Sequence, residues 1–220
     1  MQKEYEQANP AGTPPLVVRS GRLVATCARL RKSEKGVPSY NLAAMDIYFL
    51  RHASAGSHKT SVAADERRPL DADGIQQCVT VGRALTAMGI KVDVVISSPL
   101  KRAQQTAELV AREIGYDDRI EISDALRPDA DYRAFEQLLQ TNAKRDEIMV
   151  VGHNPSLSEF VSLLISGGAS HTAVELKKAA IAKVPVDGNS PSLQWCLTAK
   201  AVRTLQEGGS TKSRPKSSRK

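Results

Sequence analysis

The stretch Asp46-Ile-Tyr-Phe-Leu-Arg51-His52-Ala-Ser-Ala-Gly56 predicts how the rest of the chain is arranged. Asp46 to Leu50 is rich in aromatic and aliphatic residues, which is typical of a short buried strand. A guanidinium and an imidazole follow at once, before a loop of small residues. Because ligands of open α/β sheets bind outside the carboxyl ends of the strands, this stretch predicts a strand that delivers Arg51 and His52 to a site. A lone histidine at a strand end is more often structural, so the case depends on the rest of the chain.

The composition is that of a globular protein with one domain. The chain has 220 residues, of which 41% are hydrophobic and 25% charged, enough for one sizeable core. It has no apolar run of bilayer length, and its N-terminus has no signal-type hydrophobic block. Its three cysteines are odd in number, far apart and without metal-ligand spacing. These features predict a cytoplasmic protein without a membrane partner, a bound metal or a cofactor.

The net charge of +7 is concentrated in two flanks. Residues 1–44 carry seven Lys and Arg against three Asp and Glu, and residues 207–220 carry five against one, so the middle is close to neutral. We therefore expect a folded domain over residues 45–206, a disordered basic tail over 207–220 and no specific nucleic-acid partner. Residues 1–44 are expected to be either a disordered leader or upstream sequence that precedes a physiological start at Met45.

From Met45 onward, strand and helix patterns alternate. The predicted strands are residues 46–50, 92–97, 120–122, 147–151, 180–184 and 193–198, with a turn at 187–189 between the last two. The predicted helices are residues 73–88, 99–114, 131–142 and 155–165. This alternation predicts an α/β fold with a mainly parallel sheet and helices on both faces.

Polar groups follow three of the predicted strands. They are Arg51 and His52 after the first, Ser97 and Ser98 leading to Arg102 after the second, and His153 after the third. In a parallel sheet these ends share one edge, so two imidazoles and two guanidinium groups should converge there. Such a cluster favours an anion, and phosphate suits arginine well. A histidine beside the phosphorus can hold the oxygens, or it can attack and form a phosphohistidine intermediate.

Several spaced motifs resemble those of the histidine phosphatase superfamily, and in particular its SixA-type phosphohistidine phosphatase branch. They are Arg51-His-Ala-Ser-Ala-Gly56, Ser97-Ser-Pro-Leu-Lys-Arg102-Ala-Gln-Gln-Thr106, Gly152-His-Asn-Pro155, Arg68-Pro-Leu-Asp-Ala-Asp-Gly74, Leu126-Arg-Pro128 and Trp195. The resemblance covers roughly residues 45–200 and implies a three-layer sandwich of the phosphoglycerate-mutase type. It also implies His52 as the nucleophile, with Arg51, Arg102 and His153 binding the phosphoryl group.

One departure from the resemblance bears on the substrate. Relatives that act on phosphate esters usually have a Glu acid after a Leu in this region, whereas Arg127 follows Leu126 here. Asp129 and Asp131 are alternative acids. An imidazole leaving group, with a reference pKa of roughly 6.5, needs a proton less than an alkoxide does. With a short connection over residues 115–130, this favours phosphohistidine on a protein, such as a phosphotransfer domain or phosphocarrier, as the substrate of a monomeric enzyme.

Other interpretations stay open at this point. The protein could be a small-molecule phosphomonoesterase or a mutase of the same superfamily, or a phosphate-binding module without activity. Arg68 could reach the pocket or fix the loop, and Ser98 and Asn154 are expected to cap helices or orient pocket groups. His58 and His171 are expected to be surface residues.

Overall fold

A computed structural model describes residues 17–19, 22–24, 44–58, 61–167, 173–187 and 191–208. The chain divides into two compact units, Met1–Gly36 and Val37–Lys220. In the first unit, β1 (Val17–Arg19) and β2 (Arg22–Val24) pair in antiparallel fashion. The rest of the predicted leader before residue 44, the predicted tail beyond residue 208, and His171 lie outside the described residues.

The second unit is built on a mixed sheet with the strand order β5-β4-β6-β3-β7-β8. The strands are β3 (Met45–Arg51), β4 (Val94–Ser97), β5 (Glu121–Ile122), β6 (Glu147–Gly152), β7 (Ile181–Val186) and β8 (Trp195–Leu197). The helices are α1 (Val62–Glu66), α2 (Ala72–Ala87), α3 (Lys101–Glu113), the 3-10 helix η1 (Asp124–Leu126), α4 (Tyr132–Thr141), α5 (Ser156–Ser166) and α6 (Ala199–Gly208). β5, β4, β6 and β3 are parallel to one another, while β7 is antiparallel to β3 and to β8.

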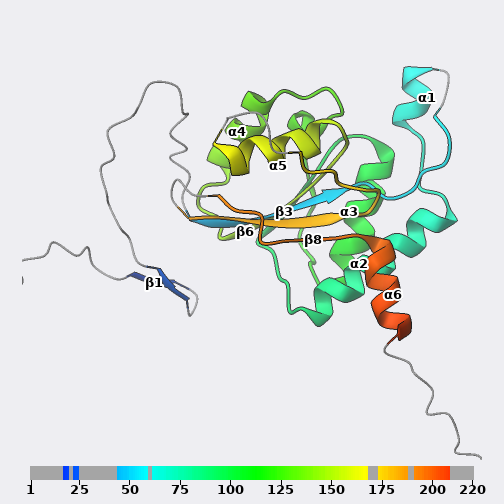
Figure 1. Ribbon diagram of the computed structural model, residues 1–220. Helices are drawn as coiled ribbons and strands as arrows, with labels where there is room; N and C mark the ends of the chain where they lie inside the picture. Colours follow the sequence, from blue (N-terminus) through cyan, green and yellow to red (C-terminus); the bar gives the residue numbers. More distant parts are fainter. Residues whose placement is uncertain are drawn as a thin grey trace, which may run out of the picture. The chain divides into compact units, whose positions relative to one another are not determined.

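Helices cover both faces of this sheet, because side chains of the central strands alternate between two buried clusters (Figure 1). Ile47 and Phe49 of β3 point to the side of α4 and α5, where Phe135 and Phe160 stack with ring centroids 4.7 Å apart. Leu50 belongs to the other cluster, which includes residues of α2, α3 and α6. Complete burial of each large side chain contributes about 1.5–3 kcal/mol, so these two layers fix the position of β3. The predicted mainly parallel, three-layer α/β fold is confirmed.

The α-helices α1 and α6 and the 3-10 helix η1 were not predicted, and the start of the helix predicted at residue 99 was wrong. α1 lies in a segment predicted as a loop, and α6 begins in the last part of the predicted domain, for which no element was predicted, and continues to Gly208, into the predicted tail. The third helix begins at Lys101 rather than Pro99, because Leu100 keeps an extended backbone, with φ −72° and ψ 135°, as its N-cap. In the described part of the chain, no helix combines the length and the apolar character that a membrane span requires.

Candidate active site

The exits of three parallel strands meet at one edge of the sheet. β6 lies between β3 and β4, with Gly152 opposite Arg51 and Val151 opposite Ser97. Backbone hydrogen bonds continue just beyond the strands, since His52 N donates to Gly152 O at 3.0 Å and Ser98 N donates to Val151 O at 2.9 Å. The predicted convergence is therefore present in the structure, and it follows from the parallel register alone.

His52 is a buried imidazole held in one tautomer. Its Nδ1 lies 2.7 Å from the carbonyl oxygen of Ala53. A carbonyl only accepts hydrogen bonds, so Nδ1 carries the proton and Nε2 keeps its lone pair. Burial, and then three nearby guanidinium groups, lower the pKa of His52 to about 3. The ring is thus neutral at pH 7, as a nucleophile needs to be.

The loop after His52 is held by side chains of α2, α3 and the segment before α2. Ala53 N donates to Thr106 Oγ1 at 3.1 Å, and Gly56 N donates to Asp71 Oδ2 at 2.7 Å. Gly74 of α2 lies against this loop so closely that a Cβ there would be 2.0 Å from the carbonyl oxygen of Ser54. The loop therefore has little freedom to move away from His52, and the imidazole is pre-positioned.

His153 leaves the neighbouring strand and faces His52. The two ring centroids are 4.9 Å apart at an interplanar angle of 50°. His153 Nε2 is 2.9 Å from the hydroxyl oxygen of Ser98. Burial, then the proximity of His52 and of two arginines, lower the pKa of His153 to about 2. Both imidazoles are neutral at pH 7, so the positive charge of the site comes from its arginines.

Arg51 and Arg102 supply that charge. Arg51 Nη1 donates to Leu176 O at 2.8 Å, and Arg102 Nη1 donates to the main-chain oxygen of Asp65 at 2.9 Å. Burial lowers the pKa of both guanidinium groups from its ordinary value. Among the described residues, the buried nitrogen atoms Arg51 Nε, Arg102 Nε and His153 Nδ1 make no hydrogen bond to the protein. Buried nitrogens of this kind fit a site that binds an oxyanion, because an unsatisfied buried polar atom is costly.

Arg68, Asn154 and Ser98 make hydrogen bonds around the cluster. Arg68 is buried, and its Nη1 donates to the carbonyl oxygens of Ala55 and Gly56 at 2.8 and 2.9 Å. These hydrogen bonds hold the loop after His52, while Arg68 Nε also contacts Asp65 of the cluster, so both predicted roles stay predictions. Asn154 Nδ2 donates at 2.9 Å to the same Leu176 oxygen that Arg51 contacts, and Ser98 orients His153.

Comparisons with known proteins identify the family of the chain. Residues 47–138 match the model of the histidine phosphatase superfamily (branch 1). An uncharacterised protein of Picosynechococcus sp. is 34% identical over 140 residues, which cover 62% of this chain and 82% of that protein. Phosphohistidine phosphatase SixA of Escherichia coli is 28% identical over 158 residues, which cover 70% of this chain and 94% of SixA.

The chain belongs to the histidine phosphatase superfamily.

The fold agrees with this family. The structure of the protein histidine phosphatase SixA complexed with tungstate aligns with a TM-score of 0.64 and 24% identity, over 71% of this chain and 98% of that one. The predicted family is confirmed, and with it the predicted class of enzyme, a phosphatase. His52 and Arg102 lie inside the matched segment, whereas His153 lies beyond it and joins the site through the fold.

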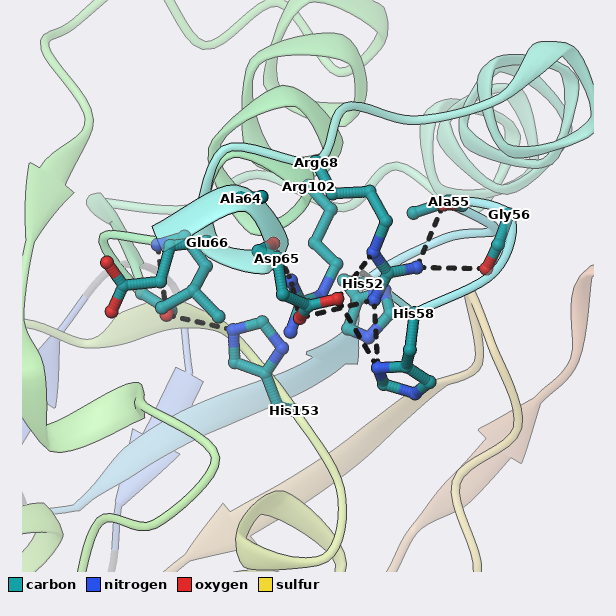
Figure 2. A network of polar contacts seen from close by, with 12 residues as sticks. His52, Ala55, Gly56, His58, Ala64, Asp65, Glu66, Arg68, Arg102 and His153 are labelled. Carbon is teal, nitrogen blue, oxygen red and sulfur yellow. Dashed lines mark hydrogen bonds and ion pairs between the residues drawn. The ribbon is translucent and has the colours of Figure 1, made fainter. Parts of the chain in front are cut away.

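A carboxylate that the sequence analysis did not single out reaches into the histidine phosphatase site from α1. Asp65 Oδ2 lies 3.2 Å from Arg102 Nη1, and its Oδ1 lies 2.9 Å from Arg68 Nε. Figure 2 shows this carboxylate between the arginines and close to the exposed imidazole of His58. The only local signals were Ser61, which caps α1, and the spacing of Asp65 and Arg68.

Among the described residues, the two predicted alternative acids make no hydrogen bond or ion pair with the histidines or arginines of the site. Asp131 caps α4 by accepting a hydrogen bond from Ala134 N at 2.7 Å, and Asp129 is exposed. Arg127 takes the position after Leu126 and pairs with Glu66 of α1 at 2.7 Å and with Asp124 at 2.6 Å. Within the ranges that the structure describes, no group of three or more His, Cys, Asp or Glu side chains could hold a metal ion.

Proposed function

We propose that this protein removes phosphoryl groups from phosphohistidine on another protein, through a covalent intermediate on His52. The observation that supports it best is the state of His52, whose Nδ1 is bonded to a carbonyl and whose Nε2 lone pair is free. His153 lies 4.9 Å from it between ring centroids, and Arg102 is buried in the same cluster. One neutral nucleophile thus stands beside hydrogen-bond donors for phosphoryl oxygens.

The reaction consists of two displacements at phosphorus. His52 Nε2 attacks the phosphoryl group, and the P–N bond to the substrate imidazole breaks, with its electron pair passing to the departing nitrogen. Water then attacks phosphorus, the bond to His52 Nε2 breaks, and phosphate and a proton leave. Arg51, Arg102 and His153 stabilise the equatorial oxygens in both steps.

The absence of an acid after Leu126 supports a P–N substrate. An imidazole protonated on its other nitrogen leaves as a neutral molecule, whereas an alkoxide leaving group requires a proton from the enzyme. Arg127 takes that position, and its side chain is partly exposed to solvent. Hydrogen bonds to Asp124 and Glu66 raise the pKa of its guanidinium group. The similarity to SixA, whose name gives a phosphohistidine phosphatase, favours the same substrate class.

The remaining parts of the proposal concern the setting of the enzyme. We place the catalytic domain at residues 45–208, which extends the predicted boundary of 206 to the end of α6, and expect it to act as a monomer in the cytoplasm. Cys78 is buried, and burial raises the pKa of its thiol to about 12, which fits a residue that stays reduced and unreactive.

The test compares substrates and one variant. Purified protein and a His52→Ala variant are incubated with a phosphohistidine peptide, a phosphoserine peptide and a sugar phosphate, and phosphate release is followed by phosphorus NMR. We expect the phosphohistidine peptide to be cleared fastest, and only by the protein that retains His52. Equal clearance by His52→Ala would refute the proposal, faster release from the sugar phosphate would favour a small-molecule phosphatase, and release from none would favour a binding module.

A further inference from the structure

α1 is held over the active site by charge rather than by apolar packing. None of its residues is buried, and Val62 is 80% exposed. Its C-terminal residues instead make ion pairs with distant parts of the chain: Asp65 with Arg102, and Glu66 with Arg127. We call residues 61–66 the acidic strap. Because no buried apolar surface anchors it, the strap can be displaced by breaking a few ion pairs.

Asp65 offers Arg102 the kind of group that a substrate would offer. A carboxylate and a phosphoryl group both bind guanidinium through charged oxygens at similar distances. Arg102 Nη1 donates to two oxygens of Asp65, the main-chain oxygen at 2.9 Å and Oδ2 at 3.2 Å. Arg102 is only 4% exposed, so a phosphoryl group and the Asp65 carboxylate would repel each other strongly if both approached it.

We infer that Asp65 competes with the phosphoryl group for Arg102 and so weakens the binding of inorganic phosphate and other small anions. This inference rests on the proposed function, which assigns Arg102 to phosphoryl binding. A free phosphate ion has only its own oxygens with which to displace the carboxylate. A phosphorylated protein gains additional contacts outside the site, and these can offset the cost of moving the strap. Displacing Asp65 thus costs free energy for every phosphoryl ligand, and a small anion has few other contacts to offset that cost.

The pair between Glu66 and Arg127 helps to hold the strap in place. Arg127 Nη1 lies 2.7 Å from Glu66 Oε1, and its Nε lies 2.6 Å from Asp124 Oδ1 of η1. Arg127 therefore links the strap to the segment that follows β5. In this arrangement Arg127 acts on substrate binding indirectly, by keeping Asp65 next to Arg102.

Calorimetric titration with inorganic phosphate tests the competition. We expect Asp65→Asn to bind phosphate about tenfold more tightly than the unmodified protein, a change in binding free energy of about 1.4 kcal/mol. Asp118→Asn is the matched control, because Asp118 is exposed and precedes β5, toward the amino ends of the parallel strands. That variant loses the same charge and should stay within about twofold of the unmodified protein. Unchanged or weaker binding by Asp65→Asn would overturn the inference.

Arg127→Gln separates competition from simple electrostatics by the sign of its effect. Removing a cation near an anion site should weaken phosphate binding if charge alone matters. If Arg127 holds the strap, the substitution should instead tighten binding by about two- to threefold. Arg127 is at the surface, so this variant also covers the case in which Asp65→Asn does not fold, and weaker binding by Arg127→Gln contradicts the inference.

The same samples distinguish failure of this inference from failure of the proposed function. Phosphohistidine turnover by the unmodified protein tests the function and is independent of the ratio between variants. A protein that binds phosphate more tightly as Asp65→Asn, but clears no phosphohistidine, would retain the competition and lose the proposed reaction. The reverse result would retain the reaction and reject Asp65 as a competitor.

Discussion

The two histidines of the active site leave neighbouring parallel strands, yet their rings are held through opposite nitrogens. His52 is bonded at Nδ1, to the carbonyl oxygen of Ala53, and His153 is bonded at Nε2, to the hydroxyl of Ser98. A carbonyl only accepts a hydrogen bond, whereas a hydroxyl both donates and accepts. The first ring is therefore confined to one tautomer, while the second can present Nδ1 with or without a proton.

This difference suits the two histidines to different roles in the reaction. A fixed lone pair on His52 Nε2 suits repeated attack on phosphorus. An adjustable proton on His153 Nδ1 suits a donor to phosphoryl oxygens whose charge changes during the reaction. The Ser98 hydroxyl can donate to Nε2 when Nδ1 carries the proton.

The largest expected effect is at the first exit. His52→Gln should lower kcat more than about 10⁴-fold and abolish the phosphorylated enzyme, because the nucleophile is lost. His153→Gln should lower kcat about 10²-fold, as for a lost oxyanion donor, while a labelled phosphoenzyme still forms. The measurement is rapid-quench trapping with ³²P-labelled phosphohistidine substrate. Label on His52→Gln, or none on His153→Gln, would reverse the assignment.

The next largest effect is expected on the free energy of unfolding, through packing behind the two strand ends. A Cβ at Gly74 would lie 2.0 Å from the main-chain oxygen of Ser54, behind the His52 loop. A Cβ at Gly152, where β6 meets His153, would lie 3.1 Å from Leu126 O. We expect Gly74→Ala to cost about 3 kcal/mol of unfolding free energy and Gly152→Ala about 1 kcal/mol, measured by urea denaturation. Equal costs would mean that the first loop yields as easily as the second.

The same contrast explains what was predictable from the sequence. Arg51, His52 and His153 directly follow strands with buried apolar runs, and parallel pairing brings such ends together without further information. Arg102 lies in the first turn of α3, whose start was misplaced by only a short distance. Local patterns were therefore sufficient for the strand exits and for the layers that position them.

The acidic strap could not be predicted from local sequence patterns. α1 buries none of its residues, so it leaves no apolar period in the sequence. Its place depends on pairs that span 37 residues, from Asp65 to Arg102, and 61 residues, from Glu66 to Arg127. Which acidic residues make such pairs is determined by the folded chain, so the sequence pattern pointed to Asp129 and Asp131 instead of Asp65. α6 was missed for a related reason, since Ala199 and Val202 are the only buried residues among positions 199–207, for which burial is described.

Acid should destabilise the fold through both imidazoles. Their folded-state pKa values, about 3 for His52 and about 2 for His153, lie below the ordinary value of 6.5. Below pH 6.5 the unfolded chain therefore binds protons that the folded chain does not, and unfolding free energy falls as pH falls toward 3. The expected slope is at most about 1.4 kcal/mol per pH unit for each ring. Urea titrations from pH 7 to 4 should show that unfolding free energy depends less steeply on pH in His153→Gln. An identical slope would contradict the conclusion that both imidazoles are neutral in the folded protein.

The smallest effect concerns the hydroxyl that distinguishes the second exit. Ser98→Ala removes the partner of His153 Nε2, 2.9 Å away, and leaves the fixed tautomer of His52 untouched. Because the ring is still present, kcat should fall only about three- to tenfold, with Ser98→Thr restoring most of the loss. Nitrogen NMR of the imidazoles should show a changed tautomer ratio for His153 and the original one for His52. A loss of 100-fold or more, with both tautomers unchanged, would instead place the Ser98 hydroxyl in contact with the phosphoryl group, and the difference between the exits would then lie in Ser98 rather than in the rings.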